Sequence, residues 1–233
     1  MPPFQLYELV GKTPSLKISP YCWRIRFALK HKGLDFESVP LTFLEVHEQI
    51  PKLGQDLIPR VPVLVDPDNV AHQDSFSIAE YLETAYPDKP SLFHGQPTLH
   101  RFFQSYVDKV ISMAIFRVIV RQIPERALDQ PNREYFYRSR TEMLRVPLEE
   151  IEAQRTEWAQ QVQKGMELVR QAIQDSGKFL SGDQVGYADF ILFGTFKWVE
   201  NINKDELEEL LLKGQTEDDT VVRDWFQRMQ VYA

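Results

Sequence analysis

Two potentially reactive side chains, Ser19 and Cys22, lie one helical turn apart in the segment KISPYCWRIRFALKHKGL. Ser19 is followed by Pro20, and this pair is typical of a helix start. The serine hydroxyl can accept hydrogen bonds from the first backbone N–H groups, and proline at the first helical position loses no needed donor. Because exposed N–H groups and the positive end of the helix dipole attract anions, the segment predicts an anion site beside Ser19.

The residues that follow predict how this helix is oriented. From Cys22 onward, Ile25, Ala28 and Leu29 recur at helical spacing and form an apolar stripe. Gly33 is a typical helix stop. Arg24, Lys30, His31 and Lys32 are polar, and the basic residues of the last turn suit the negative end of the helix dipole. The local pattern leaves open whether Ser19 or Cys22 is the reactive group.

Composition excludes several classes of function. The 233 residues are 43% apolar and 26% charged, which is ordinary for a folded protein of one large or two small domains. The formal charge of −7 argues against nucleic-acid and anionic-membrane partners. A single cysteine excludes an internal disulfide and a cysteine-based zinc site. With neither a signal-peptide pattern nor an apolar run of membrane-spanning length, a soluble, cytoplasmic protein is expected, without membrane insertion.

The first 87 residues alternate between strand and helix patterns. Strands are expected at Phe4–Leu9 and in DFESVPL, on either side of the Ser19 helix, and this β-α-β order favours parallel pairing. A loop and short helix follow over about 43–57. Two short strands around the turn Asp66-Pro67-Asp68-Asn69 must be antiparallel, and a helix follows Asp74-Ser75. This order predicts a thioredoxin-like domain over residues 1–87.

The remainder of the chain is helical in pattern. DKPSLFHGQP, residues 88–97, is rich in turn-forming residues and is predicted to be a linker, so that residues 98–233 form an all-helical domain. Its expected helices are Leu99–Gln122, about Asn132–Leu144, Leu148–Asp175, Tyr187–Asn201, Asp205–Leu212 and Val221–Tyr232. In VGYADF, Asp189 is expected to reach back to Gly186 as a helix cap, which makes this motif structural.

Two further motifs each allow a plain and a functional interpretation. Val61-Pro62 opens an apolar strand, either as an ordinary edge proline or, in the cis form, as a site where the Val61 backbone pairs with a peptide-like ligand. Asp74-Ser75 resembles a simple helix cap. At the same end of the sheet as Ser19, however, its carboxylate and hydroxyl could bind the ammonium and carboxylate of an amino acid.

These elements together resemble a cytosolic glutathione transferase. More narrowly, LYELV, ISPYCWRIRFALKHKGLDF, RVPVLVD, QDSFSIAEYLETAYPDKPSLF, LSGDQVGYADF and VRDWF are similar to segments of bacterial lignin β-aryl-etherases and fungal etherase-like (FuA) glutathione transferases. The resemblance spans nearly the whole chain. It departs at Cys22, where the etherases have valine, and at Gly186, where the superfamily usually has serine or threonine.

The resemblance implies specific roles. Ser19 matches the active-site residue whose hydroxyl stabilises the glutathione thiolate, and Val61 precedes the matching cis-proline, Pro62. Asp74 and Ser75 match the pair that holds the γ-glutamyl end. His47 and Arg60 fall where related classes contact the glycyl end or the backbone of glutathione. The residues suggested as walls of a hydrophobic substrate site between the domains are Tyr21, Phe43, Phe103, Tyr106 and Met113, although each fits an ordinary core position equally well.

The resemblance also implies glutathione as co-substrate, no metal and a homodimer. Serine at position 19 cannot form a mixed disulfide with glutathione, so the expected reaction is attack of glutathione on hydrophobic or aromatic electrophiles, including lignin-derived β-aryl ethers, as in detoxification. Cys22 begins the apolar stripe and is expected to be an inert core thiol. Two alternatives are a slow or non-catalytic binding protein for hydrophobic or polyphenolic compounds, and a glutathione peroxidase or reductase that uses Cys22.

Overall fold

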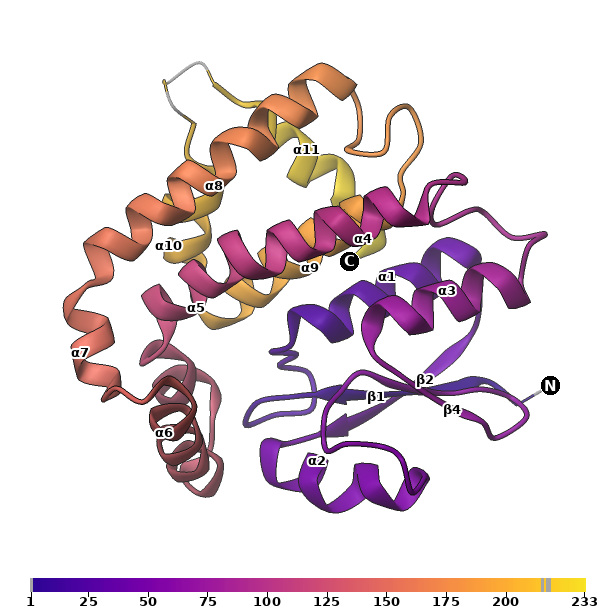
Figure 1. The fold of residues 1–233 in the computed structure, drawn as a ribbon, viewed down its shortest axis with the longest axis horizontal. Helices are drawn as coiled ribbons and strands as arrows, with labels where there is room; N and C mark the ends of the chain where they lie inside the picture. Colours follow the sequence, from indigo (N-terminus) through magenta and orange to yellow (C-terminus); the bar gives the residue numbers. More distant parts are fainter. Residues whose placement is uncertain (1, 215, 217–218) are drawn as a thin grey trace.

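A computed structural model describes residues 2–214, 216 and 219–233 of the chain. Figure 1 shows a sheet domain built by the N-terminal residues and a larger, wholly helical part built by the rest. This is the thioredoxin-like α/β plus all-α fold predicted from the sequence. Residues 1, 215, 217 and 218 fall within the ranges predicted for the two domains, 1–87 and 98–233, but lie outside the described part.

The sheet has four strands in the order β2-β1-β3-β4. Their bounds are β1 Phe4–Leu9, β2 Phe36–Leu41, β3 Val63–Val65 and β4 Ala71–Gln73. As the β-α-β order predicted, β1 and β2 are parallel, with Leu9 opposite Leu41. The pairs β1–β3 and β3–β4 are antiparallel, and Val63 lies opposite both Tyr7 and Gln73.

The helices of this domain cover both faces of the sheet. Their bounds are α1 Pro20–Lys32, α2 Phe43–Gln49, the 3₁₀ turn η1 Ile50–Leu53, and α3 Ser75–Ala85. Figure 1 shows α1 and α3 on one face and α2 on the other. The helix ends follow from local sequence: Thr42 and Glu45 form a capping box on α2, and Gly33 ends α1 at a φ of 61°.

The helical domain follows most of the predicted ranges. Its bounds are α4 Pro97–Tyr106, the π-helical turn η2 Val107–Ser112, α5 Met113–Ile119, the π-helical turn η3 Ile123–Ala127, α6 Gln130–Leu144, α7 Leu148–Ala153, α8 Arg155–Ser176, α9 Tyr187–Ile202, α10 Lys204–Leu207, the π-helical turn η4 Glu208–Leu212, α11 Val221–Met229 and the 3₁₀ turn η5 Gln230–Tyr232. The predicted cap of α9 is confirmed, because the Asp189 carboxylate accepts from Gly186 N at 3.1 Å.

The single helix predicted over Leu148–Asp175 is wrong. The chain leaves helical geometry at Gln154, with φ −95° and ψ 16°, and this divides it into α7 and α8. The residues on the two sides of the break pair with different elements. Glu152 binds Arg121, whereas Arg155 binds Glu206. These ion pairs join residues far apart in sequence, so helical periodicity could not reveal them.

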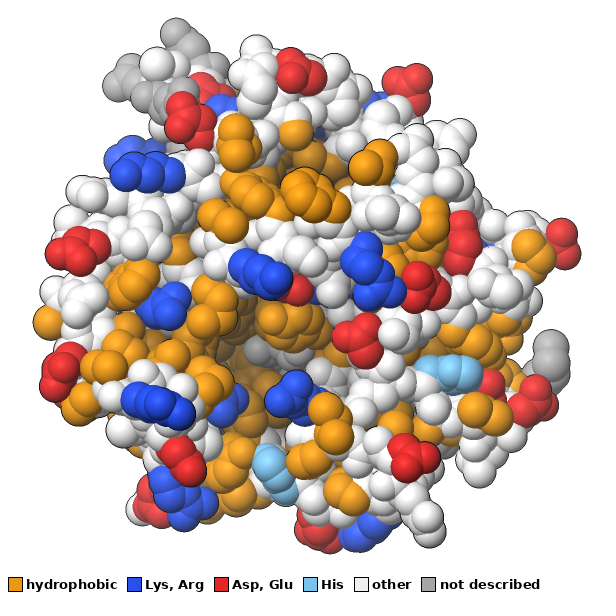
Figure 2. Space-filling model, in the orientation of Figure 1, with side chains coloured by type: hydrophobic (Ala, Val, Ile, Leu, Met, Phe, Trp, Pro, Cys, Tyr) orange, Lys and Arg blue, Asp and Glu red, His pale blue; other side chains and the backbone are white. Residues whose placement is uncertain are grey.

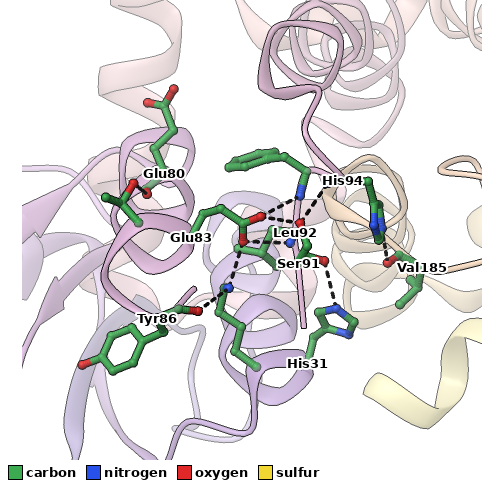
Figure 3. A network of polar contacts seen from close by, with 11 residues as sticks. His31, Glu80, Glu83, Tyr86, Ser91, Leu92, His94 and Val185 are labelled. Atoms are coloured by element: carbon green, nitrogen blue, oxygen red, sulfur yellow. Dashed lines mark hydrogen bonds and ion pairs between the residues drawn. The ribbon is translucent and has the colours of Figure 1, made fainter. Parts of the chain in front are cut away.

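Two basic residues of α1, Arg24 and Lys32, have fully buried side chains. Arg24 pairs with Asp108 of η2, and Lys32 Nζ lies 2.8 Å from the Glu83 carboxylate of α3. Figure 3 shows Glu83 in contact with the linker segment at Ser91 and Leu92. Each buried cation is thus paired with a carboxylate in place of the water it loses on burial. Such pairing is the usual condition for burying a charge.

Close packing of the two domains brings α9 against the beginning of α1. At Gly194 of α9, a Cβ atom would lie 2.7 Å from the backbone oxygen of Pro20. A larger residue would therefore push α9 away from the helix start that Ser19 caps. The contact between α9 and α1 thus helps to hold the helix start at Ser19 in place.

Candidate active site at the carboxyl edge of the sheet

The sheet topology brings four separate segments to one edge. Because β1 and β2 are parallel, the chain leaves both at the same edge, after Leu9 and after Leu41. Because β3 runs antiparallel to β1, residues 61–62 enter the sheet at that edge. Residue 74 leaves β4 there as well. The edge thus joins the start of α1, the start of α2, the Val61-Pro62 turn and the start of α3.

Ser19 caps α1 as predicted. Its side chain is buried, with 5% exposure, and its Oγ accepts from the backbone N–H of Cys22 at 3.3 Å. The hydroxyl keeps its own hydrogen for donation, because the bond to Cys22 uses an oxygen lone pair. A sulfur atom placed at this helix terminus would meet both the serine O–H and the positive end of the dipole.

Cys22 lies in the core with 1% exposure. Burial, followed by the nearby negative charge of Glu8, raises the pKa of its thiol to about 12. Since the thiolate is the nucleophilic form of cysteine, this environment suppresses its reactivity near neutral pH. The observation agrees with the predicted structural role of Cys22.

The Val61-Pro62 peptide bond is cis. The interpretation as an edge proline is wrong, because β3, which begins at Val63, is an inner strand between β1 and β4. Pro62 is buried and Val61 is half-buried. The turn they form precedes β3 at the edge where α1 begins.

Asp74 and Ser75 begin α3. One carboxylate oxygen of Asp74, Oδ1, accepts from Phe76 N at 3.1 Å and from Ser77 N at 3.0 Å. Asp74 is exposed and has a positive φ of 76°, an uncommon backbone conformation for a residue other than glycine. Ser75 is buried, and its backbone oxygen accepts from the Tyr187 hydroxyl at 2.8 Å.

His47 and Arg60 occupy different surroundings. His47, on α2, lies with its Nε2 2.6 Å from the hydroxyl of Tyr135 on α6. Arg60 is exposed in the segment before β3, where its backbone oxygen accepts from Gln73. His47 is therefore part of a contact between the two domains, whereas Arg60 stays on the sheet domain.

The five predicted wall residues come from four helices, α1, α2, α4 and α5. Tyr21 lies beside Ser19, and Phe43 begins α2 at the same sheet edge. Phe103 stacks on Tyr106, whose hydroxyl donates to the backbone oxygen of Gly165 on α8. Met113 is half-buried at the start of α5. A role for all five in a single substrate site stays a prediction.

The surface is hollowed in several places. Figure 2 shows hydrophobic side chains around a hollow between α5 and α6 and the sheet domain, with Lys or Arg side chains at its border. Tyr106 lines a different hollow of about 450 Å³ between η2 and α8, and another of about 610 Å³ lies between α8 and η4. Neither of these last two is lined by Ser19, Val61 or Asp74.

Sequence reasoning missed the groups that surround Tyr21. The Arg24 guanidinium lies 4.6 Å from the Tyr21 ring centre and binds the Asp108 carboxylate through Nη2 at 2.5 Å. Burial, with the negative charges of Asp108 and Asp74, raises the pKa of Tyr21. The spacing of Tyr21 and Arg24, one turn apart on α1, indicates that these two side chains can meet. Asp108 lies 84 residues away from Arg24, so local spacing gives no indication of that contact.

Comparison with protein families identifies both parts of the chain. The N-terminal domain of glutathione S-transferases matches residues 18–85, and their C-terminal domain matches residues 98–232. The chain belongs to the glutathione S-transferase family. Curated relatives agree with this assignment.

The chain is 25% identical to the glutathione S-transferase-like protein ustS of Aspergillus flavus, over 92% of this chain and 87% of that protein. It is 30% identical to a zeta-class glutathione S-transferase of Euphorbia esula, over 77% of this chain and 73% of that protein.

Solved transferase structures share the fold. Glutathione transferase GSTFuA3 of Phanerochaete chrysosporium has a TM-score of 0.85 at 23% identity, and the match covers 100% of this chain and 98% of that one. CsGST63524 of Ceriporiopsis subvermispora, solved in complex with glutathione, has a TM-score of 0.84 at 23% identity over 99% and 98% of the two chains. The resemblance to FuA transferases is thus confirmed at the level of the fold.

Two kinds of feature are absent from the described residues. No helix among them combines the length and hydrophobicity needed to cross a membrane. Within the same residues, no group of three or more His, Cys, Asp or Glu side chains is arranged to hold a metal ion.

Proposed function

We propose that this glutathione S-transferase is of the serine type, with Ser19 as the catalytic residue. The Ser19 hydroxyl donates to the sulfur of glutathione and, with the N-terminus of α1, favours the thiolate over the thiol. The thiol proton passes to solvent. The observation that carries the proposal is the contrast at the start of α1, where Ser19 caps the helix at the sheet edge while Cys22 lies in the core with a raised pKa.

The remaining edge residues are proposed to hold glutathione. The backbone of Val61, before the cis-proline Pro62, pairs with the cysteinyl part. Asp74 faces the γ-glutamyl ammonium and Ser75 its carboxylate, an arrangement supported by the position of both residues at the edge where Ser19 lies. His47 and Arg60 are the proposed contacts for the glycyl end.

The electrophile is proposed to be hydrophobic or aromatic. The thiolate sulfur bonds to an electron-poor or ether-bearing carbon while the leaving group, such as chloride or phenolate, departs with the bonding electron pair. Lignin-derived β-aryl ethers belong to this class. The hydrophobic hollow in Figure 2, bordered by α5 and α6, supports such a substrate.

Steady-state conjugation of glutathione to chlorodinitrobenzene at neutral pH tests the assignment. Ser19→Ala should lower the rate roughly ten- to a thousandfold, because one donor to a developing anion contributes on the order of 10² to 10³ in rate. Cys22→Ser should stay within a few-fold of the wild type. An inactive but folded Cys22→Ser protein would instead favour the peroxidase or reductase alternative.

A binding protein without turnover is the second candidate. The same hydrophobic hollow would serve to hold polyphenolic ligands. Displacement of a fluorescent dye by such compounds, with no conjugation of any electrophile, would favour this candidate over the transferase.

A further inference from the structure

A seam between α2 and α6 joins the two domains beside the candidate active site. The backbone N–H of Leu44 donates to Asn132 Oδ1 at 3.1 Å, and His47 meets Tyr135 one turn further along both helices. Phe43, the first residue of α2, lies at the sheet edge where α1 also begins. The seam therefore begins at the same sheet edge as the helix that Ser19 caps.

Arg140 of α6 lies in this seam against aromatic rings. Its guanidinium carbon is 5.3 Å from the ring centre of Phe43 and 5.1 Å from that of Phe136. Its Nη1 donates to the hydroxyl of Ser139 at 3.2 Å. A guanidinium has five N–H donors, so this one bond leaves most of them to be satisfied.

Arg140 is half-buried, and its charge is not balanced by a carboxylate as the charges of the buried residues Arg24 and Arg170 are. Arg24 pairs with Asp108 and Arg170 with Asp219, whereas no ion pair to Arg140 is found among the described residues. Burial lowers the pKa of Arg140, and nearby Tyr135 acts in the opposite direction. A half-buried guanidinium with free N–H donors and no carboxylate partner is suited to bind an anion from outside the chain.

We propose that Arg140 binds a carboxylate carried by an aromatic second substrate, which makes aromatic acids the preferred electrophile class. This inference rests on the proposed transferase function. The planar guanidinium can hold a carboxylate through two parallel hydrogen bonds. The Phe43 ring beside it provides an apolar face on which the aromatic ring of the same ligand packs.

Glutathione itself carries a glycyl carboxylate that could compete for this cation. The aromatic acid is favoured because Phe43 and Phe136 flank the guanidinium, and these rings suit an aromatic ligand better than a peptide end. Kinetic constants distinguish binding of the glycyl carboxylate from binding of a carboxylate on the electrophile. A site for the glycyl end would affect the KM of glutathione with every electrophile.

The test compares two electrophiles that differ by one carboxylate, chlorodinitrobenzoate and chlorodinitrobenzene. In both, the thiolate sulfur bonds to the chlorine-bearing carbon and chloride leaves with the electron pair. Arg140→Gln should lower kcat/KM for the benzoate roughly ten- to a hundredfold, as expected for loss of a charge-assisted hydrogen bond. With chlorodinitrobenzene, both kcat/KM and the KM of glutathione should stay within about twofold of the wild type.

Two further variants serve as references. Arg138→Gln removes the same charge from an exposed position on the same helix and should leave the preference for the benzoate unchanged. Arg140→Lys keeps the charge but loses the two-pronged geometry, so its loss should be intermediate. If Arg140→Gln does not fold, Arg140→Lys tests whether Arg140 binds the carboxylate of the benzoate.

Equal losses for both electrophiles, or a raised KM of glutathione with chlorodinitrobenzene, would overturn the proposal. Isothermal titration of dinitrobenzoate in the presence of S-methylglutathione measures the affinity for the carboxylate without any turnover. If the wild type conjugates neither electrophile, the transferase function fails, but weaker dinitrobenzoate binding by Arg140→Gln than by Arg138→Gln still supports the carboxylate site. Equal binding by these two variants contradicts it.

Discussion

At the scale of single residues, the surroundings of Ser19 and Cys22 separate two side chains that the sequence places one helical turn apart. The backbone bond to Ser19 Oγ sets its hydroxyl at the helix terminus, whereas burial disfavours the thiolate of Cys22. The contrast was predictable from the apolar stripe that Cys22 begins. The partners of Tyr21 were not, because Arg24 and Asp108 meet only in the folded chain.

Asp74 offers a prediction that separates binding from helix capping. Asp74→Asn keeps an oxygen for the N–H groups of Phe76 and Ser77 and tolerates the positive φ, but it removes the charge. Affinity for S-methylglutathione should fall by about 1.5 to 3 kcal/mol, while Ser19→Ala, which acts on the sulfur, should bind the analogue almost normally. Isothermal titration measures both. Unchanged binding by Asp74→Asn would mean that the carboxylate only caps α3.

At the scale of elements, local signals predicted where helices begin and end, and distant contacts decided the rest. Ser19, Gly33 and Asp189 act as caps because their partners lie within a few residues. The break at Gln154 and the burial of Lys32 depend on residues far along the chain, and periodicity carries no information about those. The same reason hid the seam between α2 and α6.

The junction between α4 and α9 predicts sensitivity to acid. His100 Nδ1 accepts from the backbone N–H of Ala188 at 2.9 Å, and burial, followed by the charge of nearby His94, lowers the pKa of His100 to about 4. A lowered folded-state pKa means that this stabilisation is complete above about pH 6.5 and is lost as the pH falls toward about 4. His100→Asn keeps an acceptor but cannot titrate.

Urea unfolding at neutral pH and at about pH 4 measures this effect. The acid-induced drop in the midpoint should be smaller for His100→Asn than for the wild type. His47→Asn, at an exposed position on α2, is the control: it removes the contact with Tyr135 at both pH values, so its acid-induced drop should equal that of the wild type even where its midpoint differs. An identical drop in all three proteins would show that His100 is not the titrating group.

At the scale of the whole molecule, we expect a homodimer that covers the outer face of α4. The helix predicted over Leu99–Gln122, which is rich in apolar residues, divides into α4, η2 and α5. Val107, Ile111, Ile115 and Ile119 are buried, whereas Leu99 and Phe102 are 61% and 73% exposed. Exposed apolar side chains of this size on one helix are typical of an interface.

Light scattering of the purified protein at micromolar concentration measures the assembly. The wild type should have twice the mass of the chain. Phe102→Glu should shift it toward the monomer, because a charge would be buried in the interface. Val231→Glu, at an exposed position near the C-terminus, should stay dimeric. A monomeric wild type would contradict the expectation.

The central claim is that Ser19 stabilises the thiolate of bound glutathione. Ultraviolet difference absorbance of the thiolate, recorded against pH for glutathione bound to the wild type, Ser19→Ala and Cys22→Ser proteins, tests it directly. The account predicts a midpoint below that of a free thiol, near 8.5, in the wild type and in Cys22→Ser, and a midpoint that returns toward that value in Ser19→Ala. The same low midpoint in Ser19→Ala, or its loss in Cys22→Ser alone, would contradict the account.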